Sequence, residues 1–235
     1  MTSPAIHRVT TLDLAFRPSP WAFAEQRRAE IDAHFASRQA EKPDLFNGRV
    51  LLGRRPVFDG THFSAEYFET DFASFLAWRD FSEADGDVFN GFGMGALRGS
   101  DGAYVLGEMS ASTANGGRIY FPAGTPDPDD IRGARVDLEA SVAREVEEET
   151  GLVPADYVAA DDWHCVVTPR SIALMRILDV AMSGEALRAR IEANLARQAE
   201  PELSAMHLVR GVDDFTPAMP VFVTAFIAAQ LKAAV

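Results

Sequence analysis

Four glutamates crowd the end of one helix-forming segment, and this feature constrains the chain more than any other. Glu145, Glu147, Glu148 and Glu149 fall within five consecutive positions, and Gly151 ends the helix as a C-cap. Like charges three and four residues apart repel each other, and the C-terminal end of a helix already carries partial negative charge. The placement therefore costs stability, and it calls for an explanation beyond helix propensity.

The helical spacing puts three of these carboxylates on one face. At 3.6 residues per turn, Glu149 projects about 40° and Glu148 about 60° from Glu145, on opposite sides, whereas Glu147 points away. Oxygen ligands of this kind suit Mg²⁺, which binds carboxylates and waters and bridges to substrate phosphates. A solvated Glu-rich helix face is the alternative explanation for such a run of charge. The residues around the glutamates decide between the two.

Residues 144–152 read Arg-Glu-Val-Glu-Glu-Glu-Thr-Gly-Leu, which resembles the catalytic helix of the Nudix superfamily. In that family this helix holds metal ions on the diphosphate of a nucleoside diphosphate linked to a second group, and water attacks phosphorus. The resemblance implies Mg²⁺ or Mn²⁺ as cofactor. It also implies catalytic roles for Arg144, Glu145, Glu148 and Glu149, with the glutamates as metal ligands and the arginine orienting them.

The segment that precedes this helix also resembles the family. Residues 121–124, Phe-Pro-Ala-Gly, follow a predicted strand, as a Phe-Pro-x-Gly element does in Nudix hydrolases. The glycine carbonyl of that element faces the metal site, so the resemblance makes Gly124 a further metal-site residue. The general base often lies outside the helix, and four acids are candidates for it: Asp161, Asp162, Glu200 and Glu202.

Two positions depart from the family pattern. Val136 stands where the full pattern has a glutamate, and Asp130 stands where it has a glycine. An extended acidic loop at 125–135 separates Gly124 from the helix. Asp137, the predicted N-cap, and Glu139 are candidates to replace the missing acid, although neither is in the family register. The departures bear on metal binding more than on the fold.

An arginine in an apolar strand is the main candidate for a substrate contact. The segment Ile172–Val180 is apolar on both faces, yet it contains Arg176, and a buried arginine needs an anionic partner. That partner is either the substrate diphosphate, which suits the planar guanidinium, or a structural carboxylate such as Asp179. Arg170, in the loop before this strand, is the second candidate for substrate binding.

The net charge and the cysteine content limit the kinds of partner and compartment that we expect. The net charge of -13 disfavours nucleic acid as a partner, because the average field of the chain repels it. Cys165 is the one cysteine, which excludes an internal disulfide and fits a reducing compartment. The N-terminus lacks a signal-peptide pattern, and the chain lacks a run of about 18 apolar residues. We therefore expect a cytoplasmic protein with a small-molecule partner and no membrane partner, and a homodimer stays open.

The order of predicted elements favours an α/β fold. Mixed strands and helices in this order predict a Nudix-like α/β/α sandwich around a mixed sheet, carrying an N-terminal α/β extension. We place the extension at 1–86, with unknown role, and the Nudix hydrolase domain at 87–235, with the boundary in the acidic stretch 82–86. Strands are expected at 49–52, 92–97, 104–109, 118–121, 157–167, 172–180 and 206–209, and helices at 20–36, 72–81, 137–150, 185–198 and from 220.

The predicted function is metal-dependent hydrolysis of a diphosphate linkage in a nucleoside diphosphate derivative. A nucleotide sugar or an ADP-ribose type compound is the expected substrate class. Coenzyme A derivatives are an alternative class, because Gly117-x-x-x-Phe-Pro-x-Gly fits half of the signature for them. A Nudix-fold module that binds a nucleotide with weak or no catalysis is the alternative function, which the departure at Val136 permits.

Overall fold

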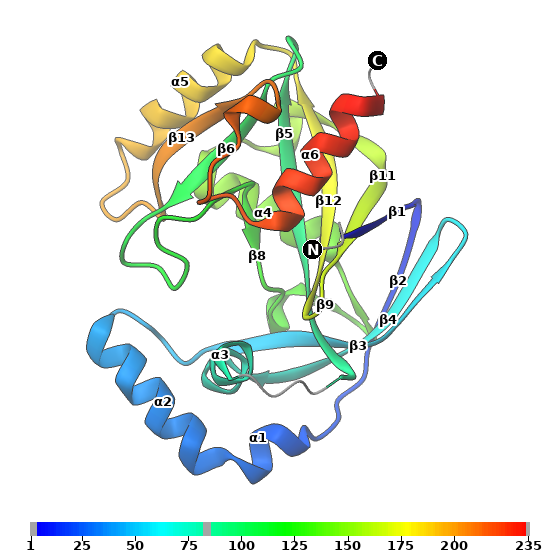
Figure 1. Cartoon of the computed structure of the whole chain (residues 1–235), viewed down its shortest axis with the longest axis vertical. Helices are drawn as coiled ribbons and strands as arrows, with labels where there is room; N and C mark the ends of the chain where they lie inside the picture. The colour runs from blue at the N-terminus through cyan, green and yellow to red at the C-terminus, as the bar shows by residue number, and fades with distance from the viewer. Residues whose placement is uncertain (1–3, 82–85, 234–235) are drawn as a thin grey trace.

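A computed structural model describes residues 4–81 and 86–233, and its strands join one large sheet (Figure 1). The strands are β1 (Ala5–Val9), β2 (Thr11–Phe16), β3 (Arg49–Asp59), β4 (His62–Asp71), β5 (Val88–Gly99), β6 (Tyr104–Met109), β7 (Ile119–Tyr120), β8 (Ala123–Gly124), β9 (Ile131–Arg132), β10 (Arg135–Val136), β11 (Tyr157–Val167), β12 (Ser171–Val180) and β13 (Leu203–Val209). The helices are α1 (Ala22–Gln26), α2 (Arg28–Glu41), α3 (Phe72–Asp80), α4 (Leu138–Thr150), α5 (Gly184–Leu195) and α6 (Val221–Ala233), with single 3-10 turns at Pro128–Asp130, Pro154–Asp156 and Val212–Asp214.

The sheet is mixed, as predicted. Its main path runs β1-β11-β12-β5-β3-β4-β2-β10-β9, with β6, β7, β8 and β13 attached beside it. The pairs β5–β12 and β2–β4 are parallel, and the other pairs are antiparallel. The long parallel pair β5–β12 forms the centre of the sheet that α4 and α6 cover.

Alternate residues of β5 show that α4 and α6 cover opposite faces. A Cβ added at Gly93 or at Gly95 would stand 2.5 Å from a methyl group of α4, on Val142 and Val146 respectively. Phe92 points the other way, and its ring lies 5.6 Å from that of Phe222 at the start of α6. Because neighbouring strand residues face opposite sides, the sheet is sandwiched between the two helices. This confirms the predicted α/β/α arrangement.

Local sequence explains where α4 begins and ends. The Asp137 side chain accepts a hydrogen bond from the Ala140 N–H at 3.0 Å, which confirms Asp137 as the N-cap. Gly151 ends the helix with φ of 73°, in the left-handed region that favours glycine. The glycines of β5 then let the helix approach the sheet closely, so its acidic last turns are held in fixed positions.

The segment before residue 82 extends the same sheet. β1 pairs with β11, and β3 pairs with β5, so strands of this segment flank strands of the remainder on both sides. The helices α1, α2 and α3 pack under it, around a cluster that includes Trp21, Phe68 and Trp78. Residues 82–85 of the predicted boundary lie outside the described residues. The division of the chain at residue 86 stays a prediction.

Several elements differ from the sequence-based expectations. The helix predicted at 20–36 is two helices, α1 and α2, because the backbone turns at Arg27 (φ −111°, ψ 22°). The strand predicted at 49–52 continues to Asp59, and β1, β2 and β4 were not predicted. The acidic loop at 125–135 contains a 3-10 turn and the short hairpin β9–β10. Among the helices of the described residues, none has the length and apolar character needed to cross a membrane.

Candidate active site

Two glutamates of α4 meet the short strand β8. The Ala123 N–H donates to the Glu149 carboxylate at 3.4 Å. A Cβ added at Gly124 would stand 2.3 Å from the Glu145 Oε1 atom, so only a glycine leaves room for this carboxylate against the strand. The structure thus brings Gly124, Glu145 and Glu149 together, as the motif predicts.

Burial and mutual repulsion raise the proton affinity of both carboxyls. Glu149 is 4% exposed, and its Oε2 atom has no hydrogen-bond partner among the described residues. Burial raises the pKa of Glu145 to about 7, against the opposing effect of Arg144 and with help from Glu148 and Glu202. The pKa of Glu149 lies well above its usual range, mainly because the carboxyl is buried and further because Glu145 and Glu202 are negatively charged. Ionising both carboxyls in this place therefore costs free energy unless a cation offsets their charge.

The other two glutamates of the run lie farther out. Glu147 is exposed and points away from β8, as the helical spacing predicts. The Glu148 side chain is 61% exposed and lies 3.7 Å from the Arg144 guanidinium. Glu148 therefore stands at the rim of the site, whereas the spacing alone put it on the same face as Glu145 and Glu149.

A residue that the sequence reasoning did not assign, Asp130, holds Arg144. The Arg144 Nη2 atom donates to both oxygens of Asp130 at 3.1 Å, and Nη1 donates to Glu145 Oε1 at 2.8 Å. Asp130 is 2% exposed, and its carboxylate also accepts from the Asp127 N–H at 3.1 Å. Arg144 thus lies between an acid of the 125–135 loop and an acid of α4.

The hairpin β9–β10 explains how Asp130 reaches this position. Val136 pairs with Ile131 across the hairpin, and the Asp137 N–H donates to the Asp130 carbonyl at 2.9 Å. Asp130 therefore lies beside the position of the missing family glutamate. The turn signal Asp-Pro-Asp-Asp at 127–130 was visible in the sequence, but the pairing that folds it back was not.

The two acids that are candidates to replace the missing glutamate have other partners. Asp137 caps α4 through Ala140, and Glu139 lies 2.6 Å from the Arg176 guanidinium. The buried acid that pairs with Arg144 from outside α4 is Asp130.

Among the four candidates for the general base, Glu202 contributes to the raised pKa of both Glu145 and Glu149. Asp162 instead forms an ion pair with Arg8, and Asp161 lines a separate cavity with Arg176 and Trp163. Glu202 follows α5 and precedes β13, so the sequence alone gave no reason to prefer it.

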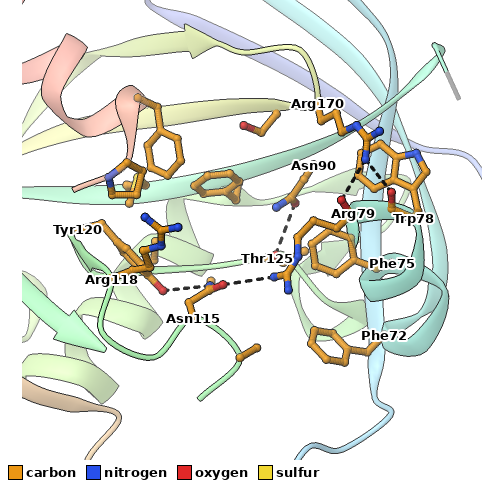
Figure 2. Close-up of a pocket in the computed structure, with 18 residues that line it drawn as sticks. Phe72, Phe75, Trp78, Arg79, Asn90, Asn115, Arg118, Tyr120, Thr125 and Arg170 are labelled. Atoms are coloured by element: carbon orange, nitrogen blue, oxygen red, sulfur yellow. Dashed lines mark hydrogen bonds between the residues drawn. The ribbon is translucent and has the colours of Figure 1, made fainter. Parts of the chain in front are cut away.

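A cavity of about 500 Å³ opens beside β8 (Figure 2). The helix α3 forms one wall, and the loop before β7 forms the facing wall, with the start of α6 beside them. The lining residues are Phe72, Phe75, Trp78, Arg79, Asn90, Phe92, Met94, Ala114, Asn115, Arg118, Tyr120, Ala123, Gly124, Thr125, Arg170, Ser171, Pro220 and Phe222.

The two arginines predicted to bind substrate have structural partners. Arg170 lines the cavity, but its Nη1 atom donates to the carbonyls of Trp78, Arg79 and Phe81 at 2.8–3.0 Å and so caps the end of α3. Arg176 does not line this cavity. It pairs with Glu139, a carboxylate that the sequence reasoning had assigned another role, and it donates to the Ala160 carbonyl at 2.8 Å. The anionic partner that the structure gives Arg176 is thus a carboxylate, and its role in substrate binding stays a prediction.

The donor set beside β8 fits a divalent cation. Glu145 and Glu149 supply oxygen ligands, and the unpartnered Oε2 atom of Glu149 is a buried acceptor that a cation would satisfy. Across residues 4–81 and 86–233, no group of three or more His, Cys, Asp or Glu side chains is already arranged to hold a metal ion. The fit therefore rests on the orphaned oxygen and on the repulsion between the carboxylates.

No family model and no curated protein match the chain. Among solved structures, it is similar to a MutT protein from Methanosarcina mazei Go1 (18% identity, 62% of this chain and 95% of that chain, TM-score 0.38). It is also similar to the Nudix hydrolase RenU from M. smegmatis (16% identity, 64% and 90%, TM-score 0.40) and to a C. elegans Ap4A hydrolase (12% identity, 61% and 96%, TM-score 0.36). Nudix hydrolases are thus among the structures that this chain resembles, as the motif predicts.

Proposed function

We propose that this chain is a Nudix-type hydrolase that cleaves the diphosphate linkage of a nucleoside diphosphate derivative with Mg²⁺ or Mn²⁺. One observation carries the proposal. Glu149 is buried against β8 with one carboxylate oxygen unpartnered, and Glu145, whose side chain is 14% exposed, lies against the same strand, which lines a cavity that contains arginines. Such a pair is unfavourable without a cation and becomes favourable with a cation that also binds phosphate.

The residues of the site have distinct roles in this proposal. Glu145, Glu148 and Glu149 hold the metal, which supplies charge neutralisation at the diphosphate when bound. Gly124 keeps β8 close enough for the carboxylates and the substrate to share the site. Arg144 orients Glu145, and Asp130 is a positioning residue that acts through Arg144.

The reaction needs one proton acceptor. A water oxygen forms a bond to one phosphorus, the bridging P–O bond breaks, and the products are two monophosphates. The attacking water loses its proton to a carboxylate, and we assign this role to Glu202 because its charge acts on Glu145 and Glu149 from outside α4.

A metal-dependent hydrolysis screen tests the proposal. Nucleotide sugars, ADP-ribose, dinucleotides and coenzyme A derivatives are incubated with the protein and Mg²⁺ or Mn²⁺, and both products are identified. We expect turnover of a nucleotide sugar or an ADP-ribose type compound, lost on chelation. Glu149→Gln should lower kcat by roughly a hundredfold, and Glu148→Gln should also lower it.

Glu147→Gln is the matched control, because Glu147 belongs to the same acidic run but is exposed and points away from β8. It should retain full turnover. Equal activity in the Glu147, Glu148 and Glu149 variants would exclude α4 as the metal site. Metal-dependent binding of a nucleoside diphosphate derivative, without turnover of any compound, would instead establish the nucleotide-binding module.

A further inference from the structure

The cavity beside β8 has a charge opposite to that of the protein as a whole. The chain carries a net charge of -13, yet the cavity lining contains three arginines, and no Asp or Glu among the described residues lines it. The acidic pair Glu145 and Glu149 contacts Ala123 and Gly124 of β8, and these two residues line the cavity. A ligand that reaches from the cavity to this pair therefore needs anionic groups, which the arginines and a cation neutralise from two sides.

Aromatic side chains give the cavity flat apolar surfaces. Phe72 and Phe75 come from α3, Phe92 from β5 and Phe222 from α6, and Phe72, Phe92 and Phe222 are only partly buried. The Phe92 and Phe222 rings form an edge-to-face pair at 5.6 Å, and those of Phe72 and Phe75 lie 5.9 Å apart. A planar ring with two apolar faces fits between such surfaces.

The three arginines differ in what already binds them. Arg170 donates to three carbonyl groups at the end of α3, and Arg79 pairs with Asp80 and donates to Asn115 at 3.3 Å. Arg118 is exposed on the facing wall, and no hydrogen bond or ion pair joins its side chain to the described residues. Arg118 is therefore the guanidinium that remains available to a phosphate.

We infer that this cavity binds the nucleoside end of the substrate, with the base between Phe72 of α3 and the Phe92–Phe222 pair, and with Arg118 on a phosphate. The inference rests on the proposed function, since the diphosphate has to run past Gly124 to the glutamates of α4. A sugar in this place would present hydroxyl groups to a lining without carboxylate acceptors, whereas a base presents flat faces. Asn90 also lines the cavity, and we assign its side-chain amide to the edge of the base, since both ends of the Asn115 amide have partners in Arg79 and Tyr120.

This assignment gives the N-terminal segment a role. The wall formed by Phe72, Phe75, Trp78 and Arg79 belongs to α3, which precedes the predicted boundary at residue 86. Asp71 caps this helix through the Ser74 N–H. The N-terminal segment therefore selects the base, while α4 carries the metal-dependent chemistry.

Equilibrium binding to the native full-length chain tests the inference without requiring turnover. Calorimetric titrations with AMP, UMP and ribose 5-phosphate are compared in chelator, where the metal site contributes nothing. We expect at least one nucleotide to bind about tenfold or more tightly than ribose 5-phosphate, because stacking adds to the phosphate contact. Equal affinities for ribose 5-phosphate and both nucleotides would overturn the assignment of the base.

Two variants locate the ligand, and each has a matched control. Phe72→Leu keeps an apolar side chain but removes the aromatic face, and Arg118→Gln removes the charge; each should weaken nucleotide binding about tenfold with an unchanged Tm. Phe46→Leu and Arg197→Gln alter exposed residues outside the cavity lining and should leave binding unchanged. Native affinity in both test variants would refute the inference.

Failure of this inference and failure of the proposed function give different results. If the chain hydrolyses its substrate but Phe72→Leu and Arg118→Gln leave KM unchanged, the nucleoside lies elsewhere and the hydrolase assignment stands. If nucleotides bind through Phe72 and Arg118 but no compound turns over with metal, the nucleoside site stands and the hydrolase assignment fails.

Discussion

Removing the charge of Asp130 while keeping its shape separates a positioning role from a structural one. Asp130→Asn retains one oxygen that can accept from Arg144 Nη2, but it removes the charge that offsets the guanidinium. In the native chain Asp130 competes with Glu145 for Arg144, at 3.1 Å and 2.8 Å respectively. Without that competition Arg144 binds Glu145 more tightly, and this disfavours the metal-bound arrangement of Glu145.

The size of the effect follows from burial. Deleting one partner of a fully buried ion pair costs about 3–5 kcal/mol. Here Asp130 is buried, but the Arg144 side chain is 33% exposed and keeps Glu145 as a partner. We therefore expect a loss of about 1–2 kcal/mol in the free energy of unfolding, discounted for solvent screening. For a chain of 235 residues this lowers Tm by roughly 3–6 °C.

Kinetic constants distinguish the two roles, because a purely structural ion pair would affect Tm without changing kcat or the Mg²⁺ dependence. We expect Asp130→Asn to lower kcat by about 10–100-fold and to raise the Mg²⁺ concentration needed for half-maximal activity, measured well below Tm. Asp129→Asn is the matched control, since Asp129 is the exposed neighbour in the same turn. A lower Tm with native kcat and native Mg²⁺ dependence would refute the positioning role and leave a structural ion pair.

Three further predictions concern the pH dependence of stability, the approach of β8, and the ion pair on the other side of α4. In chelator, Glu145 should make the native chain less stable as pH rises from about 4.5 to 7, because its pKa in the folded chain is about 7 and its ordinary value is 4.5. The ionised form therefore favours unfolding. Glu145→Gln should make urea midpoints measured across this range less dependent on pH, with the remaining dependence due to Glu149. Gly124→Ala should raise the Mg²⁺ requirement about tenfold by displacing the Glu145 carboxylate, whereas Gly211→Ala, with open space at its Cβ, should not. Arg176→Met should leave KM within about twofold of native and cost less than about 1 kcal/mol, because its partner Glu139 is 69% exposed; a large rise in KM would return Arg176 to the substrate site.

The elements with long, regular patterns could be predicted from the sequence. The bounds of β6 and β11 agree with the prediction. The bounds of α4 agree to within one residue, because its cap residues at 137 and 151 can be recognised in the local sequence. The strands β2 and β4 show alternating apolar residues in their sequences, but each becomes a strand only through pairing with the other and with distant neighbours. Such pairing energy is tertiary, so short segments of this kind give a weak local signal.

The residues of the site also fall into those that the sequence could predict and those that it could not. Glu145, Glu149 and Gly124 were predictable because a linear motif encodes their spacing, and the structure brings them together. Arg176 looked like a substrate ligand because the sequence shows a cation in an apolar strand but not the Glu139 carboxylate that lies across from it. The wall of the cavity on α3 comes from a segment without a motif, so only the fold relates it to the glutamates.

The placement of Asp130 predicts the effect of Val136→Glu. Because Arg144 already donates to both Asp130 and Glu145, a glutamate at the buried position 136 adds a further acid to an arginine that has carboxylate partners. The single variant should therefore lower Tm and leave the Mg²⁺ dependence no tighter than native. In the Asp130→Asn background the same glutamate gains a free partner, so it should restore kcat at least partly, and the two changes should be non-additive. Purified single and double variants, compared by kcat, Mg²⁺ titration and Tm, complete the cycle. Additive losses would show that positions 130 and 136 do not share Arg144. Tighter Mg²⁺ dependence in the single Val136→Glu variant would show that Asp130 does not replace the missing glutamate as the partner of Arg144.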